Sequence, residues 1–190
     1  MRNLLIRLEA GFRNRWFYCK GYLLKFYLFL HGCKVGKRLK CKQWPIFRVI
    51  PNRNISIGDH VTLGYGITLE PIPGGRIILC DYVHLTQNVL ISAREEVNLG
   101  KYVSIAENVS IRDSDHGIAK GIIPHFQKSI SQPIVLKDGS GVGRGSAIFR
   151  GFVLEEGAII GAHCILMRNT KTIPNGIYFG SPPRLIAKRK

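Results

Sequence analysis

The sequence predicts an all-β protein built as a parallel β-helix of triangular coils, with a helix before it. Three observations lead to this class. Apolar residues recur at every sixth position between Val35 and Leu166, small residues often follow them, and residues 1–31 lack this period. Such a period fits neither an amphipathic helix nor an ordinary strand, but it is typical of stacked β-helix coils. The repeat positions are Val35, Cys41, Phe47, Ile57, Leu63, Leu69, Leu79, Leu85, Ile91, Leu99, Ile105, Ile111, Leu136, Val142, Ile148, Leu154, Ile160 and Leu166.

These positions fall into six groups of three, and each group supplies one triangular coil. Coils that stack at about 4.8 Å share an apolar axis that none of them could bury alone. The step from one group to the next should again be six residues, but it is ten, ten, eight, twenty-five and finally six. Because each insertion follows the third position of its group, all the extra residues leave one corner of the prism. Insertions on one face of a repeat protein commonly form its binding site.

The N-terminal segment has helical spacing instead. Its apolar stripe consists of Leu4, Leu8, Phe12, Trp16, Cys19, Leu23, Phe26 or Tyr27, and Leu30, and six basic residues lie among them with a single acid, Glu9. The uncharged run from Phe26 to Cys33 is much shorter than the roughly 20 apolar residues that span a bilayer. Two interpretations stay open. Residues 1–31 lie on an anionic membrane, which the aromatic and basic mixture favours, or the helix caps the first coil and packs on a neighbouring subunit.

Composition limits the partners and the compartment. The 190-residue chain carries a formal net charge of +16, which favours polyanions or ligands with phosphates. No zinc-finger, homeodomain, RNA-recognition or basic-zipper pattern is present, so we expect no nucleic-acid partner. Five scattered cysteines without a CxxC pair fit a reducing compartment. We expect a cytoplasmic protein, held at the inner face of the membrane if the helix binds lipid.

The predicted organisation has three parts. An N-terminal helical segment covers residues 1–33, the β-helix covers residues 34–170 with a long loop at 117–132, and a C-terminal tail covers residues 171–190.

The longest insertion begins with Asp113-Ser114-Asp115-His116-Gly117. A histidine with carboxylates beside it can act as a general base, because a carboxylate orients the ring and stabilises the imidazolium that forms. Alternatively, Asp113 and Asp115 only hydrogen-bond the backbone of the first turn of the loop. A third interpretation, a zinc site, would need His84, His116 and His125 together.

The hexads, this histidine segment, Pro133-Ile134-Val135-Leu136-Lys137-Asp138 and the tail Gly180-Ser181-Pro182-Pro183-Arg184-Leu185-Ile186 resemble the hexapeptide-repeat O-acetyltransferases. The resemblance is to the maltose, galactoside and polysaccharide-biosynthesis branch, and it covers all of the chain except the N-terminal helical segment. It implies a left-handed β-helix and a homotrimer with active sites between subunits. It also implies acetyl-CoA as cosubstrate without a metal, and His116 as the general base with Asp113 and Asp115 as the carboxylates beside it.

The resemblance implies that acetyl-CoA lies along the C-terminal coils. The candidates for this contact are Gly143, Gly161 and Ala162 on a flat face, and Arg168, Lys171 and Arg184 for phosphates. Asn88 and His125 are weaker candidates for substrate contact. Ser140-Gly141-Val142-Gly143 stands where relatives have Val-Trp-Ile-Gly, so an aromatic wall near the thioester is missing. An acyl group larger than acetyl therefore stays open.

The function that follows is acetyl-CoA-dependent O-acetyl transfer to a sugar hydroxyl in the biosynthesis of a surface polysaccharide such as capsule, O-antigen or exopolysaccharide. The sugar would be free, nucleotide-linked or lipid-linked. Two alternatives stay open: N-acetyl transfer to an amino sugar, and a trimeric β-helix scaffold without catalysis.

Overall fold

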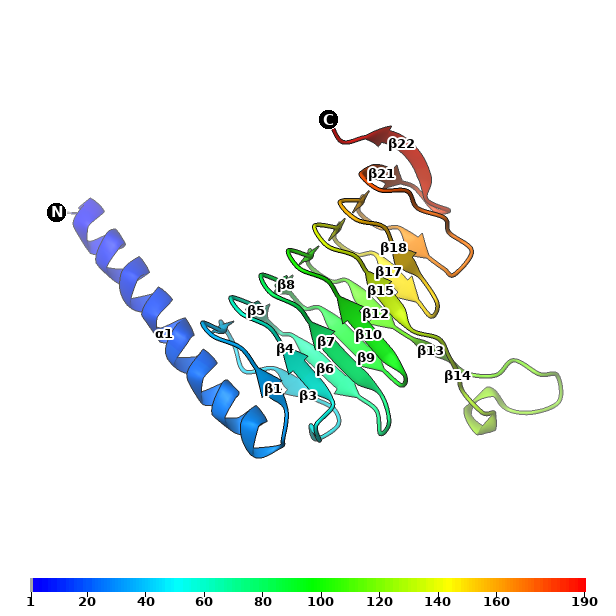
Figure 1. Ribbon diagram of the computed structural model, residues 1–190, viewed down its shortest axis with the longest axis horizontal. Coiled ribbons are helices and arrows are strands. Elements are labelled where there is room, and N and C mark those ends of the chain that lie inside the picture. Colours follow the sequence, from blue (N-terminus) through cyan, green and yellow to red (C-terminus); the bar gives the residue numbers. More distant parts are fainter. Residues whose placement is uncertain (1) are drawn as a thin grey trace.

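The structure is a computed structural model that describes residues 2–190, with side chains described from residue 6 onward. Helix α1 (Arg2–Leu30) precedes a prism of three parallel sheets, and the coils rise from the helix toward the C-terminus (Figure 1). The predicted class, an all-β parallel β-helix with one N-terminal helix, is confirmed.

The three sheets form the faces of the prism. Sheet A contains β1 (Lys34–Val35), β4 (Ile55–Ile57), β7 (Arg76–Leu79), β10 (Glu96–Leu99), β15 (Ile134–Leu136) and β18 (Val153–Leu154). Sheet B contains β2 (Lys40–Cys41), β5 (Thr62–Tyr65), β8 (His84–Gln87), β11 (Ser104–Ile105), β16 (Gly141–Val142), β19 (Ile159–Ile160), β21 (Gly176–Phe179) and β22 (Arg184–Lys188). Sheet C contains β3 (Ile46–Phe47), β6 (Thr68–Pro71), β9 (Leu90–Ala93), β12 (Ser110–Arg112), β17 (Ala147–Phe149) and β20 (Ile165–Leu166).

The repeat positions form the core. All of them except Val35 and Phe47, which belong to the first coil and are partly buried, are at most 3% exposed. Strand register supports this arrangement, because Ile105 lies over Leu85 and under Val142 in neighbouring strands of sheet B. Each coil therefore covers the apolar side chains of the one below it.

The coil count goes beyond the six predicted. Strand β21 continues sheet B beside β19, and β22 pairs with it antiparallel. Tyr178 is 4% exposed and lies opposite Ile160. It stands eighteen residues after Ile160, as Ile160 does after Val142. The repeat thus extends by one more strand into residues 171–190, which the sequence alone indicated as a tail.

The insertions leave one corner, as the broken period predicts. Each of them joins a strand of sheet C to the next strand of sheet A, and the longest carries β13 (Ser114–Asp115), the short 3-10 helix η1 (Pro124–Phe126) and β14 (Ile130–Ser131). This arm projects from the prism on the side away from sheet B (Figure 1).

Helix α1 contacts the prism with a face that the sequence did not single out. Phe17, Gly21, Leu24 and Leu28 are buried against the first coil. A side chain at Gly21 would collide with the carbonyl oxygen of Leu39, so glycine permits the close approach. Of the predicted stripe, Leu4 lies outside the described side chains, Tyr27 packs partly against the core, and the remaining members are exposed.

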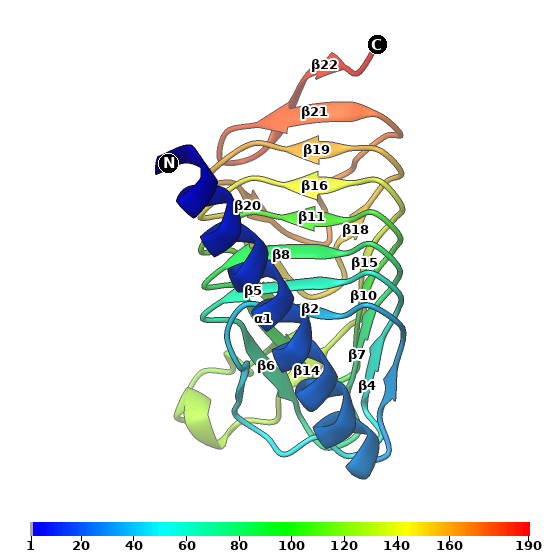
Figure 2. The ribbon, with the colours of Figure 1, turned by 90° about the vertical axis from the view of Figure 1, so that its left-hand side faces the viewer.

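The two halves of α1 differ. Every side chain from Ile6 to Trp16 is exposed, and this half leans away from the prism while the second half crosses its end (Figures 1 and 2). No helix in the described part of the chain is long and apolar enough to cross a membrane.

Candidate functional site

The arm between sheets C and A begins as a two-stranded ribbon. Strand β13 pairs antiparallel with β14, with Ser114 opposite Ser131 and Asp115 opposite Ile130. His116 follows β13 directly, and its side chain is exposed. Its ring centroid lies 6.4 Å from that of His125 on η1. The structure therefore brings His116 and His125 together on the arm.

Asp113 anchors the corner below this ribbon. Its side chain is fully buried, and its carboxylate accepts hydrogen bonds from the backbone N–H groups of Arg94, Glu95 and Glu96 at 2.7, 2.7 and 2.9 Å. These donors belong to the connection one coil below and to the first residue of β10, so Asp113 ties two coils together. Within residues 6–190, neither Asp113 nor Asp115 has a hydrogen bond to the His116 ring.

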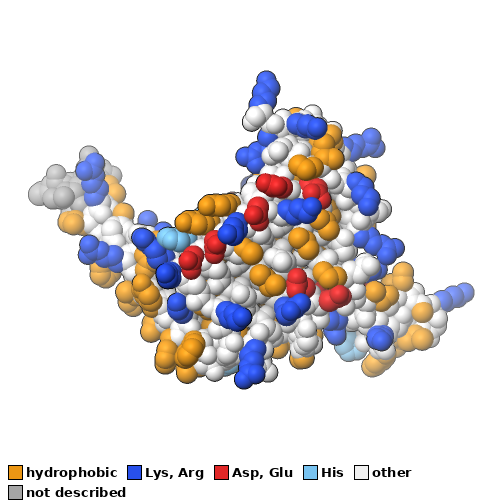
Figure 3. All heavy atoms as spheres, viewed as in Figure 1, with side chains coloured by type: hydrophobic (Ala, Val, Ile, Leu, Met, Phe, Trp, Pro, Cys, Tyr) orange, Lys and Arg blue, Asp and Glu red, His pale blue; other side chains and the backbone are white. Residues whose placement is uncertain are grey.

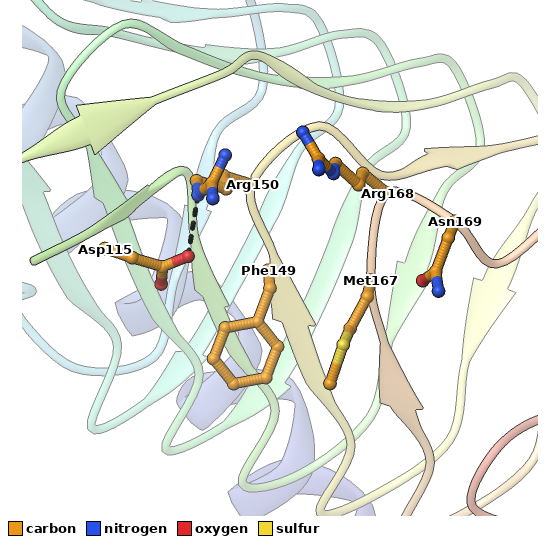
Figure 4. Close-up of a pocket in the computed structure, with 6 residues that line it drawn as sticks. All are labelled: Asp115, Phe149, Arg150, Met167, Arg168 and Asn169. Carbon is orange, nitrogen blue, oxygen red and sulfur yellow. Dashed lines mark hydrogen bonds and ion pairs between the residues drawn. The ribbon is translucent and has the colours of Figure 1, made fainter. Parts of the chain in front are cut away.

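Asp115 is held by a basic side chain from the next coil. Arg150 Nε donates to Asp115 Oδ2 at 2.8 Å (Figure 4). Arg150 Nη1 donates to Gln132 Oε1 at 3.1 Å. Gln132 also connects the end of the arm to Asp113 and to Gly151 through backbone hydrogen bonds. Arg150 therefore links both ends of the arm and holds the residue that precedes His116.

Beside this ion pair lies an open pocket of about 430 Å³. It is lined by Asp115, Phe149, Arg150, Met167, Arg168 and Asn169 (Figure 4). Phe149 and Met167 form an apolar side, whereas the arginines and Asn169 supply donors. A pocket of this kind can hold an apolar chain next to a polar or anionic group.

Sequence reasoning identified Asp115 and Arg168 but missed Phe149, Arg150, Met167 and Asn169. Phe149 brings an aromatic ring to the pocket from β17 of sheet C, whereas Gly141, where the sequence indicated a missing tryptophan, lies in β16 of sheet B. A signal existed, because Phe149-Arg150 and Met167-Arg168 follow the repeat positions Ile148 and Leu166 in successive coils. Residues that follow equivalent repeat positions stack above one another on the outer face.

The tip of the arm has its own internal structure. The Gln127 side chain accepts a hydrogen bond from the Ala119 N–H at 2.8 Å and donates to the carbonyls of Ala119 and Ile122 at 3.0 and 2.7 Å. Ile118, Ile123 and Phe126 are nevertheless 93%, 64% and 76% exposed. The arm is thus ordered by polar contacts and presents apolar side chains outward.

The expected cofactor residues do not gather in one place. Gly143 directly follows β16, and Gly161 and Ala162 directly follow β19, at the corner between sheets B and C, whereas His116 projects from the corner between sheets C and A. Sheet C separates the two corners, so one chain does not bring these groups together. Coil stacking also accounts for Gly143, because a Cβ there would lie 2.6 Å from the carbonyl carbon of Gly161.

The other candidates are scattered as well. Lys171 is exposed in the connection after β20, and Arg184 is exposed at the start of β22. Asn88 lies at the corner between sheets B and C with a left-handed φ of 51°, and its amide donates to Asn108 Oδ1 at 3.2 Å. Asn88 therefore takes part in a ladder of turn residues.

The histidines do not come together to form a metal site in the described residues. Burial, with Lys42 and Lys40 nearby, lowers the pKa of His84, which lies on sheet B. Among the described residues, no three His, Cys, Asp or Glu side chains are grouped so that they could hold a metal ion. The three histidines of the zinc interpretation do not form a cluster.

Comparisons with known proteins give the enzyme class. No model of a protein family matches the chain. The chain is 27% identical over 144 residues to a protein of Escherichia coli (strain K12) named as the lipopolysaccharide biosynthesis O-acetyl transferase WbbJ, covering 71% of this chain and 72% of the relative. It is 26% identical over 142 residues to the dTDP-4-amino-4,6-dideoxy-D-glucose acyltransferase of Escherichia coli, covering 72% of each. By this similarity the chain is an acyltransferase.

Solved structures agree with the fold of this acyltransferase. The N-acyltransferase AntD from Bacillus cereus, in complex with dTDP and 3-hydroxybutyryl-CoA, superposes with a TM-score of 0.69 at 21% identity, covering 87% of this chain and 88% of AntD. A galactoside acetyltransferase in complex with coenzyme A superposes with a TM-score of 0.56 at 20% identity, covering 82% of this chain and 64% of the other. These likenesses establish the β-helix fold of the acyltransferase.

Proposed function

We propose that the protein transfers an acetyl group from acetyl-CoA to a hydroxyl of a sugar that is destined for a surface polysaccharide. The observation that carries this proposal is the position of His116, exposed on an arm that Arg150 and Asp113 hold at the prism corner. The sugar acceptor is supported by the names of the two curated relatives. The nucleotide-linked form of the sugar is supported by the dTDP complexes of AntD.

In the proposed mechanism, one ring nitrogen of His116 accepts the proton of the sugar hydroxyl while the oxygen attacks the thioester carbonyl carbon. A carbon–oxygen bond forms, and the carbon–sulfur bond breaks as the tetrahedral intermediate collapses. The imidazolium then returns its proton to the departing thiolate, so the products are a sugar ester and free CoA thiol. No covalent intermediate on the protein is needed.

Asp115 acts through position rather than by contact with the ring. Its ion pair with Arg150 sets the start of the arm, and His116 is the next residue. The pocket lined by Phe149 and Met167 suits the acyl group and the adjacent arm of the cosubstrate. Arg168 and Asn169 supply donors at its polar side, and Lys171 and Arg184 remain the candidates for phosphate contacts farther along the prism.

We further propose that the active site is completed by a second chain in a homotrimer. In a single chain, sheet B and the His116 corner lie on opposite sides of the prism. Cyclic symmetry would place sheet B of one chain against the arm of its neighbour. The exposed apolar tip of the arm, with Ile118 and Phe126, fits contact with such a neighbour.

The direct test is His116→Ala, assayed by release of free thiol from acetyl-CoA with a panel of nucleotide-linked, lipid-linked and free sugars. Loss of a general base lowers kcat by about 10² to 10⁴, while an exposed side chain leaves the fold intact. His60→Ala is the matched control, because His60 stacks on Tyr82 at another corner. If His116→Ala turns over as fast as the parent, the mechanism is wrong.

Subunit complementation tests the shared site. His116→Ala and Ala162→Trp are each expected to be inactive as homotrimers, the second because it blocks the edge of sheet B that follows β19. Trimers refolded from an equal mixture regain activity if His116 of one chain works on sheet B of another. Activity that stays at the level of the two inactive parents would place the whole site within one chain.

N-acyl transfer to an amino sugar is the second candidate, favoured by the amino-sugar name of one relative and by the likeness to AntD. The same base serves either nucleophile. Mass spectrometry of the product, before and after hydroxylamine, separates the two outcomes, because an ester is cleaved and an amide persists.

A further inference from the structure

The outer face of α1 carries a continuous apolar surface that the prism does not cover. Leu8, Phe12, Trp16, Leu23, Phe26 and Leu30, here called the outward stripe, are between 53% and 74% exposed. At 3.6 residues per turn they share the helix face opposite Leu24 and Leu28, which pack on the first coil. Figure 3 shows apolar side chains along this edge of the molecule with Lys and Arg among them.

The free half of α1 has no support within the described chain. Its side chains from Ile6 to Trp16 are all exposed. An isolated helix of this length is marginal in water, so a surface that receives its apolar side would stabilise it. The capping of the first coil and the binding of such a surface are compatible, because they use opposite faces of the same helix.

The positive charge of the N-terminal part of the chain indicates which kind of surface binds the helix. Residues 1–58 contain thirteen of the 28 Lys and Arg residues but only one of the twelve acids, Glu9. In the free half, Arg7, Arg13 and Arg15 are exposed, whereas Lys20 and Lys25 donate to carbonyls of the first coil. A second copy of the chain brings the same positive charge to this face. An anionic surface neutralises it.

The apolar surface extends beyond the helix. In the first coil and the connection after it, Trp44, Ile46 and Ile50 are 42%, 53% and 72% exposed. Tyr27 of the helix contacts the Trp44 ring at 5.5 Å between centroids. Basic side chains of the same region, Lys37 and Arg48, are exposed as well. Aromatic and aliphatic groups with a basic surround are the composition of helices that lie in a lipid interface.

We propose that the outward stripe of α1, together with Arg7, Arg13 and Arg15, docks the protein on an anionic lipid surface. The helix lies in the plane of the interface, with Leu8, Phe12 and Phe26 among the acyl chains and the arginines at the phosphates. The prism then stands on its first coil, and the His116 arm leaves the prism three coils farther from the membrane. This inference is independent of the acyl acceptor, because it rests on the helix and the first coil alone.

The experiment uses the full-length protein with vesicles of phosphatidylcholine alone or with 30% phosphatidylglycerol, at low and high salt, without acyl-CoA or sugar. Sedimentation with the anionic vesicles should exceed that with neutral vesicles by tenfold or more and should fall at high salt. Arg7→Gln, Arg13→Gln and Arg15→Gln together should lower partitioning by about 100-fold, at roughly fivefold per charge. Arg144→Gln, Lys120→Gln and Lys190→Gln form the control triple.

The apolar contribution is tested in parallel. Phe12→Ser, Leu23→Ser and Phe26→Ser together should lower partitioning at least tenfold, whereas Ile118→Ser, Ile123→Ser and Phe126→Ser on the arm should change it less than threefold. Cys19 lies on the same exposed face, so vesicles should slow its modification by a charged maleimide at least tenfold.

Three results would overturn the proposal. Equal partitioning to neutral and anionic vesicles would remove the role of charge. If the arginine triple and the outward-stripe triple both bound anionic vesicles as well as the parent does, the membrane contact would lie outside the helix. A fall in subunit number caused by the outward-stripe triple in vesicle-free solution would mean that a second copy of the chain covers the stripe. Loss of acyl transfer to a soluble sugar in His116→Ala is scored separately, so failure of one proposal does not imply failure of the other.

Discussion

Removal of the Arg150 guanidinium should separate the positioning of His116 from the stability of the fold. The ion pair with Asp115 is 2.8 Å long, and the two side chains are 22% and 39% exposed. Because solvent screens the Asp115 carboxylate, Arg150→Met should lower the free energy of unfolding by only about 1 kcal/mol. A shift of about 1 Å in a catalytic group can cost up to about 10²-fold in rate. We therefore expect kcat to fall between tenfold and a hundredfold.

The assay combines steady-state kinetics with urea unfolding, and it has a matched control. Arg76 pairs with Glu96 at the same distance of 2.8 Å, with exposed fractions of 67% and 20%, and this pair lies in a lower coil away from the pocket. Arg76→Met should lower the stability by a similar amount and leave kcat within twofold. Arg150→Lys should recover part of the lost kcat, because a charge remains near Asp115.

A double-mutant cycle decides whether Arg150 acts through Asp115. In the Asp115→Asn background, Arg150→Met should lower kcat by less than threefold more, since the interaction is already weakened. Full additivity of the two effects would refute the positioning role, and so would an Arg150→Met enzyme with the kcat of the parent.

Four further predictions concern single side chains. Asp113→Asn should lower the free energy of unfolding, measured in urea, by about 2 to 3 kcal/mol, because an amide offers one acceptor oxygen in place of the two that bind three backbone N–H groups. The kcat of the folded enzyme should stay within threefold; a stable variant with low kcat would make Asp113 catalytic. Phe149→Ala should raise kcat/KM for butyryl-CoA relative to acetyl-CoA by about tenfold, and an unchanged ratio would exclude this pocket as the acyl site. Maleimide labelling at neutral pH should modify exposed Cys19 and spare Cys41, since burial raises the pKa of the Cys41 thiol to about 11; labelling of Cys41 first, in peptide mass spectra, would contradict the packed first coil. The folded pKa of His84 lies below the unfolded value of 6.5, so the unfolded state takes up the proton first as pH falls. The free energy of unfolding is therefore higher above pH 6.5 and decreases between pH 6.5 and the folded pKa. His84→Gln should flatten the dependence of stability on pH in that interval, and an unchanged dependence would refute this prediction.

Much of the candidate site could be predicted from the sequence, because it lies where the six-residue repeat is interrupted. The step of twenty-five residues between Ile111 and Leu136 marked the arm, its corner and the histidine at its start. The partners of the two aspartates were not visible. Asp113 bonds to backbone groups one coil below, and Asp115 pairs with Arg150, which is 35 residues later in the chain. Such contacts depend on which connections stack above each other, and local sequence carries no signal for that.

The helix shows the same division. Its spacing predicted one apolar stripe, but two apolar faces exist, and the face that packs on the prism includes Gly21, which has no side chain to indicate burial. The predicted stripe became the exposed face. Pattern alone does not distinguish a stripe that meets the chain's own core from one that meets another surface, since both exclude water in the same way.

The sequence by itself determined the coil, its apolar axis and the corner that carries the arm, because a six-residue period places every repeat position inward regardless of what surrounds it. Tertiary structure decided which residues meet at that corner. It brought Phe149, Arg150 and Met167 beside Asp115 and put sheet B on the opposite side of the prism, because the lateral neighbours of a side chain in a β-helix come from other coils, about eighteen residues or a whole insertion away.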